Sequence, residues 1–98
     1  METFKDLIFS HVPVVVDFYA EWCNPCKTMS AILLQVKEAK GDAIRIVKIN
    51  VDKNRDLAIK YSIQTIPTLM IFKDGKQLWR QSGVINTNEL IKIVEMFE

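Results

Sequence analysis

The chain has 98 residues, of which 49% are hydrophobic and 26% are charged, and its formal net charge is +1. These values are close to those of average globular proteins, so they exclude a disordered or collagen-like chain and predict a single domain over residues 1–98. The balanced charge predicts no nucleic-acid or membrane partner, and no apolar run has the length of a membrane-spanning helix.

The first half of the chain alternates helical and strand patterns. Residues 3–11 are predicted to form a short amphipathic helix, which Pro13 ends. Residues 14–20 read as a strand that is buried on both faces, because all of its residues except Asp17 are apolar or aromatic. A long helical pattern follows Cys26 and runs to Lys40, and Gly41 is its expected stop.

The second half adds two more helices and a hairpin. Residues 43–51 are predicted to form a strand and residues 54–61 a short helix. Asp74-Gly75 is a hairpin signal between strands 68–72 and 77–82, and Asn86 with Glu89 resembles the capping box of a last helix. This order predicts an α/β fold of three layers, with four helices flanking a mixed sheet of about four strands.

The two cysteines, Cys23 and Cys26, stand between the first strand and the long helix. A zinc site would need two more ligands, and His11 is the sole other candidate, so no metal is expected. A haem attachment needs His after the second cysteine, where the chain has Lys27. Two buried structural thiols remain possible, but a thiol at a helix start has a lowered pKa, which favours thiol–disulfide exchange through Cys23 with Cys26 as the resolving thiol.

Asp17 is the single carboxylate in the buried strand. Burial of an ionised carboxylate is costly and should raise its pKa toward neutrality, unless the side chain points to solvent. The functional interpretation is a proton acceptor that helps Cys26 to attack. Lys48, in the neighbouring strand, is the candidate charge beside it, although a solvated surface lysine is the simpler interpretation of Lys48 alone.

The segment Asp17-Phe18-Tyr19-Ala20-Glu21-Trp22-Cys23-Asn24-Pro25-Cys26-Lys27 resembles the signature of the thioredoxin family, and the resemblance extends over essentially the whole chain. Further matches are Lys48, Ile66-Pro67-Thr68, the segment 72–76 and Gly83. The resemblance implies a thioredoxin fold, reduction of disulfides in protein substrates through Cys23 and Cys26, and recycling by a flavin-containing thioredoxin reductase that uses NADPH. No bound cofactor is implied besides the redox-active cysteine pair.

The resemblance also implies a substrate-binding surface. Ile66 would offer backbone hydrogen bonds to an extended substrate strand, and Trp22, Asn24, Pro25, Pro67 and Gly83 would line that surface. General statistics favour a trans Ile66–Pro67 bond, because only about 5–6% of X–Pro bonds are cis in folded proteins, whereas the resemblance implies cis. Trp79 lies outside these motifs and is expected to be a packing residue.

The chain departs from the family pattern in several places. Asn24 stands where a glycine is usual and could alter the redox potential, which leaves an oxidase or isomerase as one alternative. A binding module with an incidental dithiol is the other alternative. Tyr19, Ala31 and Gln64-Thr65 also replace usual residues. The family's first edge strand is expected to be missing, which would leave strand 43–51 as an uncovered edge whose charges favour a monomer. The first residues resemble no signal peptide, so the expected location is cytoplasmic.

Overall fold

The computed structural model describes residues 3–98. The first half of this range forms α1 (Phe4–Ile8), β1 (Val14–Tyr19), α2 (Asn24–Lys40) and a short 3-10 helix, η1 (Gly41–Ala43). The second half forms β2 (Arg45–Asn50), α3 (Arg55–Lys60), β3 (Thr68–Lys73), β4 (Lys76–Ser82) and α4 (Thr87–Glu95).

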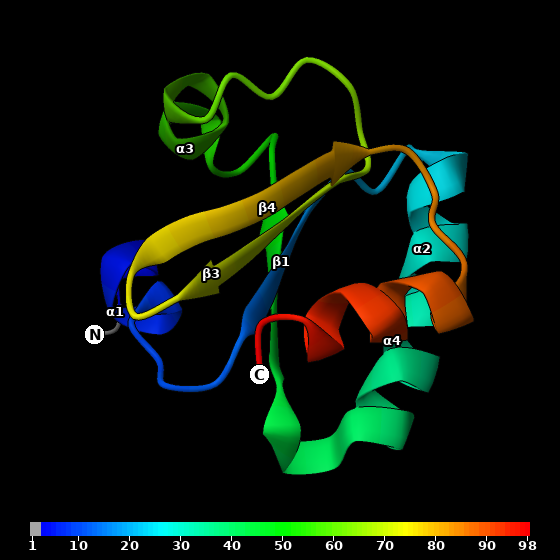
Figure 1. The fold of residues 1–98 in the computed structure, drawn as a ribbon. Coiled ribbons are helices and arrows are strands. Elements are labelled where there is room, and N and C mark those ends of the chain that lie inside the picture. The colour runs from blue at the N-terminus through cyan, green and yellow to red at the C-terminus, as the bar shows by residue number, and fades with distance from the viewer. Residues whose placement is uncertain (1–2) are drawn as a thin grey trace.

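The four strands form one mixed sheet in the order β2-β1-β3-β4. β1 pairs parallel with β2 and antiparallel with β3, and β3 pairs antiparallel with β4. In Figure 1, α2 and α4 lie together on one side of the sheet, and α1 and α3 lie away from them. The described residues therefore confirm the predicted α/β fold with a four-stranded mixed sheet and four α-helices.

Alternating residues of β1 and β3 enter two separate cores, as the pleat of a strand requires. On one face Val15, Leu69 and Ile71 pack against side chains of α2 and α4. On the other face lies an aromatic cluster of Phe4, Phe18, Tyr61 and Phe72. Because both faces of β1 are covered, its side chains from Val14 to Phe18 are fully buried.

Two predicted elements extend at one end by two or more residues beyond the observed ones. The helix predicted over 3–11 ends at Ile8, because the carbonyls of Ile8 and Ser10 accept hydrogen bonds from Gly75 and Asp74 of the hairpin turn instead of continuing the helix. The strand predicted over 43–51 is shortened to Arg45–Asn50, since residues 41–43 form η1. Tertiary contacts decide both ends.

The predicted turns are confirmed. Gly41 ends α2 with φ of +54°, a conformation that glycine adopts at little cost. Asp74 and Gly75 both have positive φ, as a two-residue hairpin turn of type I′ requires. Asn86 caps α4 by accepting a hydrogen bond from the backbone N–H of Glu89.

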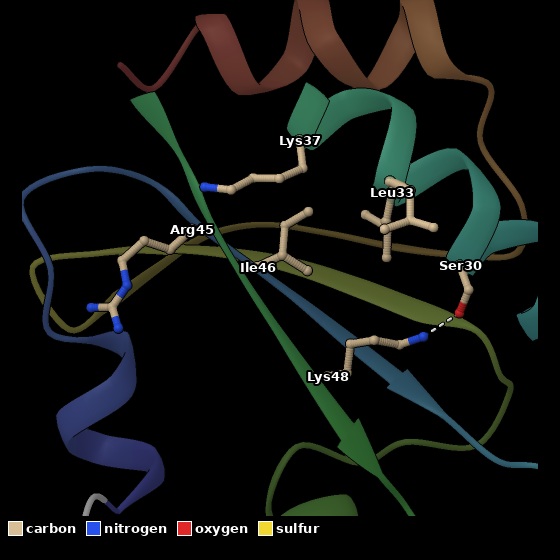
Figure 2. A pocket seen from close by; sticks show the side chains of 7 residues that line it. Ser30, Leu33, Lys37, Arg45, Ile46 and Lys48 are labelled. Atoms are coloured by element: carbon tan, nitrogen blue, oxygen red, sulfur yellow. Dashed lines mark hydrogen bonds between the residues drawn. The ribbon is translucent and has the colours of Figure 1, made fainter. Parts of the chain in front are cut away.

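The outer edge of β2 is free among residues 3–98, as predicted, because β2 pairs with β1 alone. The backbone N–H groups of Arg45 and Val51 point toward β1, where they donate to Pro13 and Tyr19. In a parallel strand the groups alternate, so those of Ile46 and Lys48 point outward. The side chains of Ile46 and Lys48 lie on the α2 side of the sheet (Figure 2).

Candidate functional site

The two cysteines lie at the N-terminus of α2, directly after β1. Cys23 is the N-cap residue, and Cys26 lies in the first turn. They form a disulfide with a Cα–Cα distance of 5.2 Å. Pro25 fits this first turn because its missing N–H would have no helical partner there. The strand therefore delivers the pair to the helix end, as the sequence predicts.

The backbone of α2 supports negative charge on the first cysteine. The N–H of Cys26 donates to Cys23 Sγ over 3.2 Å, and the helix N-terminus adds a positive dipole end. A thiolate formed on Cys23 after reduction would keep this donor. The two cysteines are buried to nearly the same degree in the disulfide state, where Cys26 is 2% and Cys23 4% exposed. Their surroundings differ more, because Cys26 lines an open hollow and Cys23 Sγ lies 3.8 Å from the Ile66 carbonyl oxygen.

A rim of residues from three segments surrounds Cys23. The Ile66–Pro67 bond is cis, as the family resemblance implies and against general statistics. The Ile66 carbonyl oxygen lies 3.8 Å from Cys23 Sγ, and the Pro67 carbonyl accepts a hydrogen bond from the N–H of Gly83. Trp22 is 70% exposed, and its indole donates to Asp52. The tertiary structure thus brings Cys23, Ile66, Pro67 and Gly83 together.

The remaining predicted residues of this rim lie next to the cysteines in the chain. Asn24 and Pro25 are both exposed at the first turn of α2. Trp79, which was expected to be a packing residue, is half-buried against the core formed with α2 and α4. This end of the sheet therefore presents the exposed Trp22 indole and the exposed residues Asn24 and Pro25.

Asp17 is fully buried, so its alternative orientation toward solvent is wrong. Neither of its carboxylate oxygens has a hydrogen-bond partner among the described residues. Burial raises the pKa of Asp17 from 3.8 to about 6, against the opposing effect of the nearby Lys48 charge. A carboxyl group with this pKa can exchange a proton near neutral pH.

Lys48 and Asp17 are directly paired across β1 and β2. The Lys48 ammonium lies 3.9 Å from Asp17 Oδ2, and it also donates a hydrogen bond to Ser30 Oγ on α2, as Figure 2 shows. Its side chain is 39% exposed, so Lys48 is both partly solvated and close to the buried acid. Lys48 is therefore both the charge beside Asp17 and a partly solvated surface lysine, as the two interpretations of the sequence have it.

Two hollows meet at the Ser30–Lys48 pair. One, of about 360 Å³, is lined by Cys26, Ser30 and Lys48 together with residues 19–21 and 27. The other, of about 470 Å³, runs along the free edge of β2 beside Leu33, Leu34 and Ile46 (Figure 2). The first hollow is open to solvent and large enough for several water molecules, and it is lined by both Cys26 and Lys48.

Sequence reasoning missed two polar partners in this region. Ser30 is an ordinary helix residue by pattern, and Asp52 lies 30 residues from the Trp22 indole that it binds. Neither contact has a local sequence signal, because each joins elements that meet only after folding. Among residues 3–98 there is no group of three His, Cys, Asp or Glu residues placed to hold a metal, and no helix has the length and apolarity to span a membrane.

A model of the family described as Thioredoxin matches residues 1–96. Thioredoxin Y2, chloroplastic, of Arabidopsis thaliana is 46% identical over 94 residues, which are 95% of this chain and 56% of that protein. Thioredoxin 1 of Synechococcus elongatus is 37% identical over 94 residues, covering 95% and 88% of the two chains. The chain spans about half the length of its plant relatives.

Solved structures agree with these matches. A structure of thioredoxin-2, described as a component of malaria parasite protein secretion machinery, superposes with a TM-score of 0.84 at 29% identity, covering 87% of this chain and 82% of that one. Chloroplastic thioredoxin z superposes with a TM-score of 0.82 at 33% identity, covering 89% and 79%.

Proposed function

The chain belongs to the thioredoxin family, and on that premise we propose that it reduces disulfides in protein substrates by dithiol exchange. The observation that carries this proposal is the Cys23–Cys26 disulfide at the start of α2, beside the Ile66 carbonyl. The fold is the thioredoxin fold, and we propose that residues 1–98 form one domain.

The proposed reaction starts from the reduced pair. The Cys23 thiolate attacks one sulfur of the substrate disulfide, and the other substrate sulfur leaves as a thiolate that takes up a proton. Cys26 then loses its proton and attacks Cys23 Sγ, which breaks the mixed disulfide and releases the second substrate thiol. Two electrons pass to the substrate, and the cysteine pair ends as the observed disulfide.

We assign the surrounding residues to binding and proton transfer. Trp22, Asn24 and Pro25 would contact the substrate from one side, while Ile66, Pro67 and Gly83 would form the other side and offer backbone groups to an extended strand. Asp17 would accept the Cys26 proton, because its raised pKa suits a base at neutral pH.

Recycling and context complete the proposal. A thioredoxin reductase that draws electrons from NADPH would reduce the Cys23–Cys26 disulfide, so the chain itself needs no bound cofactor. We propose that the protein acts as a monomer on protein partners, without nucleic acid or membrane partners. The cytoplasmic location stays a prediction.

The proposal is tested by following reduction of a small protein that has an accessible disulfide. Dithiothreitol as electron source tests the exchange itself, and NADPH with a thioredoxin reductase tests recycling. We expect Cys26→Ser to accumulate a stable mixed disulfide on Cys23, whereas Cys23→Ser should trap little. No rate above that of dithiothreitol alone, or equal trapping by both variants, would contradict the assignment.

Asn24 is the observation that supports a second candidate, an oxidase or isomerase. It is exposed and directly follows Cys23, where it can alter how well a Cys23 thiolate is stabilised. Equilibration of the cysteine pair with glutathione separates the two candidates, because a strongly oxidising pair would reject the reductase. A binding module with an incidental dithiol would keep its cellular function in Cys23→Ser.

A further inference from the structure

The Lys48 ammonium is held by three groups from two elements, Asp17 and Tyr19 of β1 and Ser30 of α2. Asp17 Oδ2 on β1 lies 3.9 Å away, Ser30 Oγ on α2 accepts its hydrogen bond, and the Tyr19 ring centroid lies 4.7 Å away. Holding a lysine side chain in one conformation costs considerable rotamer entropy, and a single partly exposed ion pair offsets little of that cost. Without further contacts, a half-exposed lysine therefore spends much of its time in solvent. Ser30 and the Tyr19 ring are therefore what keep the positive charge at the buried carboxyl.

We propose that Ser30 is a positioning residue for the resolving step: it anchors Lys48 beside Asp17 and thereby sets the proton affinity of the base that serves Cys26. This inference rests on the proposed dithiol exchange. Ser30 touches no reacting atom in it and acts through Lys48.

The position of Ser30 fits this role. It lies one helical turn after Cys26 on α2, and both residues line the same open hollow with Lys48. Lys48 reaches Ser30 from the free edge of β2, so no outer strand competes for it among the described residues (Figure 2). The anchor thus joins the helix that carries the cysteines to the strand that carries the charge.

Other groups near Asp17 do not replace Lys48. On β3 the residue opposite Asp17 is the apolar Leu69. Besides Lys48, the charged residues that line the open hollow are Glu21 and Lys27, which are both exposed and of opposite sign. The Cys26 sulfur carries no charge in the disulfide. Tyr19 contacts the Lys48 ammonium through its ring, so it acts on Asp17 through Lys48. Lys48 is the charge that opposes the effect of burial on Asp17.

Removal of the anchor should weaken the acid. In Ser30→Ala we expect the ionisation constant of Asp17 to fall about threefold, and in Lys48→Met about tenfold. The reason is that an opposite charge within about 4–6 Å lowers the pKa of a carboxyl group by about one pH unit or more. Ser30→Ala should have no further effect in a Lys48→Met background, and Ser30→Thr should restore the hydroxyl and the wild-type constant. Thr28→Ala, an exposed hydroxyl on the same helix, is the matched control.

The first measurement is an NMR titration of the Asp17 carboxyl carbon in the disulfide form, which needs no catalytic activity. An unchanged or increased ionisation constant in Ser30→Ala, or an equal effect in the Lys48→Met background, would overturn the proposal. The amide spectrum of each variant reports its folding, and Ser30→Thr supplies a second test if Ser30→Ala is perturbed.

The second measurement is the pH profile of mixed-disulfide release, started from Cys23 linked to a small thiol. Its inflection should move to higher pH in Ser30→Ala. The ionisation constant that this inflection reports should fall by the same factor as in the titration. A titration shift without a profile shift would overturn the role in the resolving step and leave the proposed exchange intact. Absence of release in the wild-type protein would instead contradict the proposed function, whatever the titration shows.

Discussion

Asp17 should lower the stability of the folded protein at neutral pH, because its ionised form is buried without hydrogen-bond partners. Replacement by Asn keeps the size and polarity of the side chain and removes its charge. The free energy of unfolding of Asp17→Asn should therefore rise relative to that of the wild-type protein as the pH increases.

The size of the effect follows from the pKa of Asp17. Folding raises it from 3.8 to about 6, and each pKa unit corresponds to about 1.4 kcal/mol, so the full effect is about 3 kcal/mol. Below pH 3.8 the carboxyl is protonated in both states and contributes nothing. Between pH 3.8 and 6 the unfolded chain ionises while the folded protein holds its proton, so stability is lost progressively, and above pH 6 the loss is complete.

Urea unfolding of both proteins in the disulfide form, from pH 3 to pH 8, measures this difference. The burial of a polar amide adds a constant amount at every pH and cancels from the slope. Asp42→Asn, at an exposed site in η1, is the control and should show no comparable trend. A stability difference between Asp17→Asn and the wild-type protein that stays constant across this range would refute the reasoning.

Three further predictions concern the rim and the sheet edge. Trp22→Ala should lower kcat/KM for protein disulfides about tenfold, because the substrate loses its contact with the indole. The free energy of unfolding measured with urea should change by less than about 1 kcal/mol, because the indole is exposed. Gly83→Ala should cost about 1–2 kcal/mol of stability in the same assay, since residue 83 has φ of +90°. Light scattering at micromolar concentration should show a monomer, because Lys48 and Arg45 place charge on the free β2 edge, and a stable dimer would contradict this.

Local sequence signals placed most of the elements. β-branched and aromatic residues predicted the position of β1, Asp74-Gly75 predicted the hairpin turn, and Gly41 predicted the end of α2. The ends of α1 and β2 were predicted less well, because hydrogen bonds to the hairpin turn and the formation of η1 decide them. Such contacts join residues that are distant in the chain and leave no periodic pattern.

The candidate site divides in the same way. The sequence by itself determined the spacing of Cys23 and Cys26, their place at a strand-to-helix turn, and the presence of a carboxylate in a buried strand. The tertiary structure decided that the Lys48 ammonium donates a hydrogen bond to Ser30 close to Asp17. It also decided that the Ile66 carbonyl lies beside Cys23. The physical reason is that spacing along a strand or helix is local, whereas the electrostatic surroundings of a buried acid depend on which elements pack against it.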